Sequence, residues 1–216
     1  MKTKKRLFFV SIAFIIAFAL WTVLIQVIDV QNIGINGTNV GFATVNSWFH
    51  ALTGVNMTLY SITDWLGLVP IFVCMLFGVV GLVQLVKRKS LTKVDFDIII
   101  LGIYYVIVIL YYLIFEMIPI NYRPILINGH MEASYPSSTT LLVLCVMPTL
   151  VFQAKTRVKN QVFKIIICTV AIAFSIFMVV GRLISGVHWV TDIIGSFFLS
   201  EGLFYLYKAF ALVKKG

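Results

Sequence analysis

The segment that decides the fold is Val162–Asp192, VFKIIICTVAIAFSIFMVVGRLISGVHWVTD. Residues 162–180 form an apolar run that is long enough to cross a bilayer as one helix, because a span needs roughly 20 such residues. Residues 181–192 then bring an arginine, a histidine and an aspartate into a short polar connection. An apolar span followed by a charged connection predicts a helical protein that lies in a membrane.

The composition extends this prediction to the whole chain. The 216 residues are 61% apolar and their mean hydropathy is +1.03, whereas soluble domains are about 45–50% apolar. We expect one membrane-embedded domain over residues 1–216, an all-α integral membrane bundle of six transmembrane helices. The six expected spans are Leu7–Ile28, Trp65–Val86, Phe96–Ile118, Ser138–Phe152, Val162–Val180 and Val190–Tyr207.

The basic residues are distributed unevenly along the chain. A net charge of +9 would suggest nucleic acid as the partner of a soluble protein. Here 15 of the 17 lysines and arginines lie in clusters within residues 2–6, 87–93, 155–164 and 208–215, which the positive-inside rule places in the cytoplasm. The pattern predicts a multi-pass protein of the cell membrane with both termini cytoplasmic and no nucleic-acid partner. Only Arg123 and Arg182 are left on the opposite face.

The longest outer connection covers residues 29–64 and contains a helical pattern. Its apolar side chains recur at helical spacing with polar residues between them, which predicts an interfacial helix in this first outer loop. A helix that packs on the outer mouth of the bundle fits the same pattern, so both interpretations stay open. The residues that carry the pattern are Val45, Trp48, Phe49, Leu52, Val55 and Leu59.

The polar connection before the last expected span carries residues suited to catalysis. His188 and Asp192 stand four residues apart, so a helix there places both on one face. The carboxylate can then hold one imidazole nitrogen while the other is free to attack. Arg182 lies upstream across a Ser185-Gly186 break, which can fold the chain back and direct the guanidinium group to the same place. This combination favours a phosphate ligand.

Two other outer segments reach the same side of the predicted bundle. Arg123 and Pro124 follow the third expected span, and Pro136 opens a sequence that is typical of a helix start. The N–H groups of such a first turn are unpaired and can hold an anion. The residues predicted to bind phosphate are Arg123, Arg182, Ser137, Ser138 and Thr139.

These three segments resemble the signature of the type 2 phosphatidic acid phosphatase superfamily, the membrane lipid phosphatases related to vanadium haloperoxidases. That signature consists of Lys-x6-Arg-Pro, Pro-Ser-Gly-His and Ser-Arg-x5-His-x3-Asp. The third part is matched from Arg182 to Asp192, with Gly181 in place of the serine. The first part is matched at Arg123, but Glu116 stands in place of the lysine. In the second part Thr139 stands where the family has its histidine.

The resemblance implies roles for the matching residues. The family's histidine at the position of His188 is the nucleophile that takes the phosphoryl group, and the aspartate at Asp192 orients it. The arginines at Arg123 and Arg182 hold the phosphate oxygens. Neither a metal nor another cofactor is implied. A phosphohistidine intermediate is therefore expected, and the two outer arginines place the active site on the extracytoplasmic side.

The threonine at position 139 leaves three alternatives, because the family's histidine there is the general acid that protonates the leaving alkoxide. The substrate can be a diphosphate, whose leaving phosphate has a second pKa of about 6 and needs little protonation. Alternatively, His130 or Glu132 supplies the acid. The third alternative is a catalytically impaired member that binds a phosphorylated lipid as a binding or transport-accessory protein. Glu116 either repels phosphate or orients Arg123.

We therefore expect a metal-independent membrane phosphatase that acts on a phosphorylated membrane lipid, either a lipid phosphate or, preferably, a polyprenyl diphosphate. The non-enzymatic lipid-phosphate binder is the alternative. Nothing in the sequence indicates the oligomeric state.

Overall fold

The computed structural model describes residues 2–212. Over that range the regular structure is helical, with isolated β-bridges in the connections. The α-helices are α1 Lys2–Val27, α2 Ala43–Thr53, α3 Met57–Leu66, α4 Leu68–Arg88, α5 Phe96–Met117, α6 Ser138–Arg157, α7 Gln161–Ile184 and α8 Val190–Ala211, and the 3-10 turns are η1 Ile35–Gly37 and η2 Leu91–Lys93. Lys214 and Lys215, which belong to the last basic cluster, lie outside the described residues.

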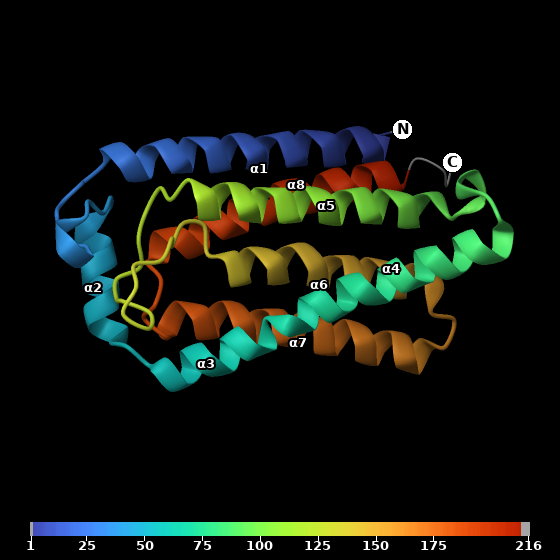
Figure 1. Cartoon of the computed structure of the whole chain (residues 1–216). Helices are drawn as coiled ribbons and strands as arrows, with labels where there is room; N and C mark the ends of the chain where they lie inside the picture. Colours follow the sequence, from blue (N-terminus) through green and yellow to red (C-terminus); the bar gives the residue numbers. More distant parts are fainter. Residues whose placement is uncertain (1, 213–216) are drawn as a thin grey trace.

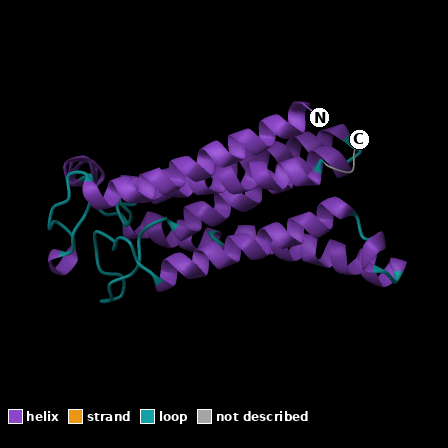
Figure 2. Cartoon of the chain, turned by 90° about the horizontal axis from the view of Figure 1, so that it is seen from above, coloured by secondary structure: helices purple, strands orange, loops and turns teal. Residues whose placement is uncertain are grey.

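The long helices lie along a common axis and alternate in direction (Figure 1). The connections at residues 28–56, 118–137 and 185–189 gather at one end of the bundle, which we call the site end. The start of α1, the end of α8 and the connections at residues 89–95 and 158–160 lie at the opposite end, which we call the basic end. Figure 2 shows the same division from above, with loops at the two ends and helices between them.

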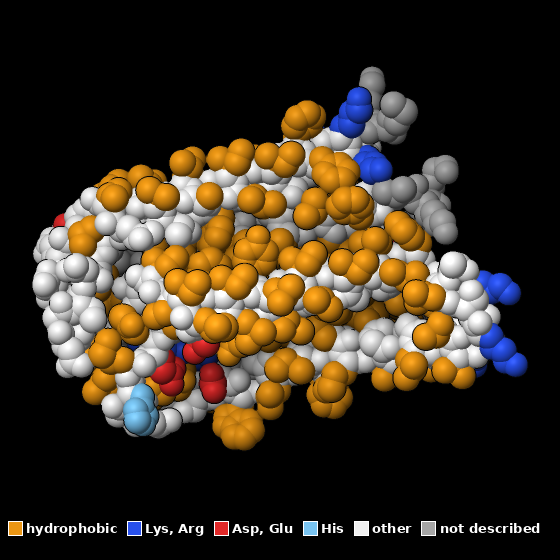
Figure 3. All heavy atoms as spheres, turned by 45° about the horizontal axis from the view of Figure 1, so that its top comes forward, with side chains coloured by type: hydrophobic (Ala, Val, Ile, Leu, Met, Phe, Trp, Pro, Cys, Tyr) orange, Lys and Arg blue, Asp and Glu red, His pale blue; other side chains and the backbone are white. Residues whose placement is uncertain are grey.

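Side-chain type follows this division. Figure 3 shows lysine and arginine side chains projecting at the basic end, and acidic side chains gathered close to arginine toward the site end. The flank between the two ends is covered largely by hydrophobic side chains. An apolar flank with charged groups at its ends suits contact with lipid chains, because helices satisfy their own backbone groups there.

Within residues 2–212, five helical segments are long and apolar enough to cross a membrane: Thr3–Val27, Met57–Arg88, Phe96–Met117, Ser138–Arg157 and Gln161–Ile184. These match the first five predicted spans. The sixth, α8, does not belong to this set, so the count of six stays a prediction. Its polarity has a physical reason, since α8 packs against α1, α5 and α6, and its Ser196 and Ser200 are fully buried among these helices. A helix surrounded by protein needs less apolar surface than one surrounded by lipid.

The first outer segment differs from the prediction of one helix across Val45–Leu59. The structure has two helices, α2 and α3, which are separated at Gly54, whose φ of +61° suits glycine and ends α2. Helix α2 lies across the site end (Figure 1), and α3 runs on into α4. The apolar spacing did not reveal this break, because Val55 and Leu59 after Gly54 continue the helical spacing of the apolar residues before it.

Helix α2 is fastened to the start of α8. The side-chain nitrogen Nδ2 of Asn46 donates to the carbonyl oxygen of Gly41 at 2.8 Å and to Oγ1 of Thr191 at 3.1 Å. Asn46 and Thr191 are both buried. The predicted outer helix is therefore held on the bundle by buried polar contacts, which agrees with the packed-on-the-mouth interpretation.

Candidate active site

The loop that carries His188 is fixed by contacts from the first outer segment. Gly186 adopts a φ of +69° and lies so close to Gly54 that a Cβ on it would come within 1.9 Å of the Gly54 carbonyl oxygen. The backbone N–H of Asn56 donates to the carbonyl oxygen of Ser185 at 2.9 Å. Nε2 of His50 lies 3.1 Å from the carbonyl oxygen of Gly186. These contacts fold the chain back between α7 and α8, as the Ser185-Gly186 break predicted.

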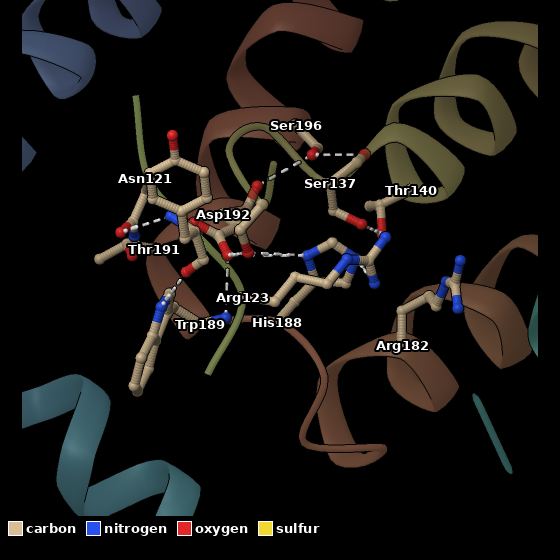
Figure 4. A network of polar contacts seen from close by, with 12 residues as sticks. Asn121, Arg123, Ser137, Thr140, Arg182, His188, Trp189, Thr191, Asp192 and Ser196 are labelled. Atoms are coloured by element: carbon tan, nitrogen blue, oxygen red, sulfur yellow. Dashed lines mark hydrogen bonds and ion pairs between the residues drawn. The ribbon is translucent and has the colours of Figure 1, made fainter. Parts of the chain in front are cut away.

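His188 and Asp192 lie together, but a serine stands between them. Nδ1 of His188 is 3.6 Å from Oδ2 of Asp192, which is too long for a direct hydrogen bond. Oγ of Ser134 lies 3.2 Å from the same Nδ1 and donates a short hydrogen bond to the same Oδ2. The backbone N–H of Trp189 also donates to that oxygen at 2.9 Å. Ser134 therefore bridges the imidazole and the carboxylate. Figure 4 shows Asp192 and Trp189 beside His188.

The other imidazole nitrogen faces an arginine. Nη1 of Arg123 lies 3.2 Å from Nε2 of His188, and both residues are buried. Burial, together with the positive charges of Arg123 and Arg182, lowers the pKa of His188 well below its ordinary value. The imidazole is therefore neutral near pH 7. With its Nδ1 proton directed at Ser134, the lone pair on Nε2 points toward Arg123.

Arg182 comes from the last turn of α7 and is 1% exposed. Its Nη2 donates to Oδ1 of Asp64 at 2.9 Å and to Oγ1 of Thr139. Its Nε and Nη1 are buried and have no hydrogen-bond partner in the part of the chain that the structure describes. The ring of Tyr60 lies against both arginines, with its centroid 4.8 Å from Cζ of Arg182 and 5.7 Å from Cζ of Arg123. Buried donors without partners are uncommon and indicate a missing acceptor.

The predicted anion-binding turn at the start of α6 contacts both α8 and Arg182. Ser137 is fully buried and fastens α6 to α8, because its N–H donates to the carbonyl oxygen of Asp192 at 3.3 Å and its own carbonyl accepts from Ser196. Thr139 contacts Arg182 directly. Ser138 is half-buried and lines a small recess beside Glu116. Of the three predicted hydroxyl residues, the structure brings Thr139 to the arginines.

The two candidate substitutes for the acid, His130 and Glu132, and the candidate modulator Glu116 lie in different places. Glu132 forms an ion pair with Arg123, with 3.1 Å between Oε2 and Nε. Its backbone carbonyl also accepts from the N–H of Arg123, because the loop doubles back on itself. His130 lies exposed near the tip of that loop, and its backbone pairs with Ile127. Glu116 is exposed near the end of α5. The ion-pair partner expected at Glu116 is therefore provided by Glu132.

Three residues of the site were missed by sequence reasoning: Ser134, Tyr60 and Asp64. Ser134 lies only three residues before Ser137, but nothing in its neighbourhood marks it as a partner of His188. Asp64 offered a weak signal, because it is an acidic residue directly before an apolar span on the outer side. The two α3 residues reach the site because α3 packs closely on α7. A Cβ on Gly181 would come within 2.7 Å of Cγ2 of Thr63.

The assembled site has two buried arginines, each with a carboxylate partner, arranged around one neutral imidazole. Two arginines supply fixed N–H donors, and the histidine supplies a lone pair held by a serine and an aspartate. Such a site can bind an oxyanion and accept an electrophilic group on Nε2, since positioning and charge neutralisation dominate phosphoryl transfer. The structure brings together Arg123, Arg182, His188, Asp192 and Thr139.

Comparison with known proteins agrees with this geometry. Residues 118–214 match the model of the PAP2 superfamily. The chain is similar in structure to a transmembrane PAP2-type phosphatidylglycerolphosphate phosphatase from Bacillus subtilis, with a TM-score of 0.65 and 19% sequence identity over 94% of this chain and 96% of that one. No curated protein matches the chain. The family resemblance drawn from the three motifs is confirmed.

Proposed function

We propose that this chain, a member of the PAP2 superfamily, is a membrane phosphatase that hydrolyses a phosphorylated lipid through a phosphohistidine on His188. One observation carries the proposal. Buried Arg123 faces the neutral imidazole of His188, and the ring of Tyr60 packs against both arginines. Among the described residues, Nε and Nη1 of Arg182 have no hydrogen-bond partner. A phosphate bound beside His188 would give these donors their acceptors.

The reaction we propose has two displacements. The lone pair on Nε2 of His188 attacks phosphorus, the bond to the leaving oxygen breaks, and the Nδ1 proton stays on the hydrogen bond to Ser134. The imidazolium character that develops is stabilised by Asp192 through Ser134. Water then attacks the phosphorus of the phosphohistidine, the N–P bond breaks, and inorganic phosphate leaves.

A diphosphate lipid is the preferred substrate in this proposal. Thr139 cannot donate a proton to a leaving alkoxide near neutral pH, and a general acid typically contributes about 10²–10⁴-fold. When the substrate is a polyprenyl diphosphate, the leaving group is a lipid monophosphate, whose second pKa of about 6 makes it stable without that proton. The missing acid therefore lowers the rate of cleavage much less for a diphosphate substrate than for a monophosphate ester.

The test is phosphate release by the purified protein in detergent micelles. We expect faster release from a prenyl diphosphate than from phosphatidic acid or phosphatidylglycerol phosphate, and loss of release in His188→Ala. Equal release with and without His188 would exclude the phosphohistidine mechanism. Faster release from either monophosphate lipid would retain the phosphatase and overturn the diphosphate preference.

A lipid-phosphate binder without turnover is the second candidate, and one observation favours it. Both arginines already carry carboxylate partners, Asp64 on Arg182 and Glu132 on Arg123, and position 139 lacks the acid. This candidate predicts that labelled prenyl diphosphate binds but is not cleaved. Thr139→His, which restores the family's residue, should then produce phosphate release from a protein that had none.

We place the site on the extracytoplasmic face, because the lysines gather at the basic end and the site lies at the other. Asn128 lies exposed in the loop at the site end. A cysteine at position 128, in a chain whose native cysteines are replaced by alanine, should react with an impermeant thiol reagent on intact cells. Reaction only after the membrane is opened would reverse the assignment.

A further inference from the structure

The phosphohistidine step leaves one group unassigned, the base that activates water for hydrolysis of the intermediate. We propose that Asp64 of α3 is this base and so does part of the work of the histidine absent at position 139. The inference rests on the proposed function of His188. It is carried by the position of Asp64 relative to Arg182, Thr139 and His188.

Asp64 lies beside the position of the missing histidine. Its Oδ1 accepts from Nη2 of Arg182 at 2.9 Å, and Oγ1 of Thr139 accepts from the same nitrogen. Two oxygens that accept hydrogen bonds from the same nitrogen lie within about 6 Å of each other. A carboxylate therefore lies next to the side chain that replaces the family's acid–base residue.

Asp64 and the nucleophile lie at different arginines. His188 faces Nη1 of Arg123 at 3.2 Å, whereas Asp64 is bound to Nη2 of Arg182. The ring of Tyr60 packs against both guanidinium groups. In the proposal, a phosphoryl group bridges the two arginines, with His188 at Arg123 and Asp64 at Arg182. That arrangement fits an in-line displacement, in which water enters on the side that the leaving group vacated.

The two other carboxylates near the site are less suited to this role. The side chain of Asp192 is completely buried behind His188, while that of Asp64 is 54% exposed and can exchange its proton with solvent. Glu132 pairs with Arg123, the arginine that faces the nucleophile, so it lies on the attacking side. Asp64 alone among these three combines access to water with a place on the leaving-group side.

The position of Asp64 is held by the fold. Asn56 caps α3 by accepting the N–H of Leu59 on its side chain, and its own N–H ties the helix start to the loop that carries His188. Gly181 lets Thr63 pack against α7 next to Arg182. The close α3–α7 contact sets the carboxylate on the guanidinium group.

In the proposed step, Asp64 takes one proton from the attacking water as its oxygen forms a bond to phosphorus. The N–P bond breaks at the same time, and its electron pair returns to Nε2 of His188. Inorganic phosphate leaves, and Asp64 passes the proton to solvent. The step needs no reactant other than water.

The experiment separates the two displacements with a prenyl diphosphate radiolabelled at its terminal phosphate. Under single-turnover conditions, Asp64→Asn should still release the lipid monophosphate at close to the rate of the unchanged protein. It should then accumulate acid-labile phosphohistidine and release inorganic phosphate about 100-fold more slowly. Asp64→Glu should recover part of that second rate, and Asp29→Asn, which changes an exposed carboxylate elsewhere at the site end, should behave like the unchanged protein.

Several results would overturn the assignment. Asp64→Asn that releases phosphate at the unchanged rate, or that loses both steps equally, excludes a base role. Trapping of phosphohistidine by Glu132→Gln and not by Asp64→Asn moves the role to Glu132. A separate outcome, absence of phosphohistidine in the unchanged protein together with activity in His188→Ala, rejects the proposed function itself.

Discussion

The two ends of the bundle each contain a cluster built on arginine, and the clusters differ in how completely the arginine is paired. At the basic end, Arg157 donates from Nε to Gln153 at 2.6 Å, from Nη1 to Asp95 at 2.8 Å and from Nη2 to both oxygens of Asp97. Each of its three nitrogens has a partner. At the site end, Arg182 uses Nη2 alone and leaves Nε and Nη1 buried without partners.

We propose that this difference separates a structural arginine, Arg157, from a substrate-binding one, Arg182. The pairing of all three nitrogens of Arg157 at the basic end ties α6 to the start of α5. Incomplete pairing at the site end is costly unless an anion completes it, since a buried donor without a partner loses its hydration without replacement. Charge alone would not distinguish the clusters, but burial and the pairing of the nitrogens do, because the side chain of Arg157 is 30% exposed and that of Arg182 is 1% exposed.

The largest expected effect is on activity at the site end. Arg182→Lys keeps the positive charge but loses the planar fork that can hold two phosphate oxygens. We expect kcat/KM for a prenyl diphosphate to fall about 10²–10³-fold, with a free energy of unfolding within about 1 kcal/mol of the unchanged protein. A matched Arg157→Lys variant should keep its activity per folded molecule. Equal losses of activity in both variants would remove the distinction between the clusters.

The next effect is on stability at the basic end. Arg157→Gln leaves Asp95 and Asp97 without their main partner, and we expect the free energy of unfolding to fall by about 1–3 kcal/mol. Denaturant unfolding in detergent micelles measures this change, and phosphate release by the protein that remains folded should be unaltered. Loss of activity without loss of stability would show that the basic end also takes part in turnover.

The smallest effect is a difference in pH dependence between the two ends. The folded-state pKa of His188 lies well below its ordinary value of 6.5, so below that pH the unfolded chain binds a proton that the folded chain does not. Stability is therefore lost as pH falls below about 6.5, by up to about 1.4 kcal/mol per unit. His188→Gln should remove this slope.

At the basic end the corresponding loss comes at lower pH. Hydrogen bonds from Arg157 and Arg88 lower the pKa of Asp95 from 3.8 to about 2. Its contribution is complete above the unfolded value and is lost as pH falls from about 4 through 2. The slope of the unfolding free energy against pH, measured from pH 7 to 5, should therefore change in His188→Gln and stay the same in Asp95→Asn. The reverse result would contradict the assignment of the two clusters.

Much of the fold could be predicted, because long apolar runs and their interruptions mark the spans. The third span was predicted to begin at Phe96 and the fourth at Ser138, and α5 and α6 begin at those residues. The break at Gly54 was missed, since apolar spacing does not register one residue of positive φ. The sixth span stays a prediction, because the polarity of α8 is compensated by neighbours that the sequence does not show.

The site was predictable to the extent that its residues lie in short motifs. Arg182, His188 and Asp192 come from one segment and Arg123 from another, and the structure brings all four together. Asp64 and Ser134 could not be identified, because each meets its partner across more than fifty residues of chain. Their contacts depend on how α3 and the loop before α6 pack, which is a property of the folded bundle. The roles of all these residues in turnover stay predictions.

The carboxylates on Arg123 and Arg182 also bear on how the product departs. Inorganic phosphate would satisfy the same donors as the substrate, so a site made of cations alone would retain it. Glu132 and Asp64 already rest on these two arginines, so these carboxylates would stay beside the guanidinium groups and weaken the binding of phosphate. The chain's own carboxylates would then help phosphate to leave the site. The arrangement with both arginines ion-paired would be the state at the end of each catalytic cycle.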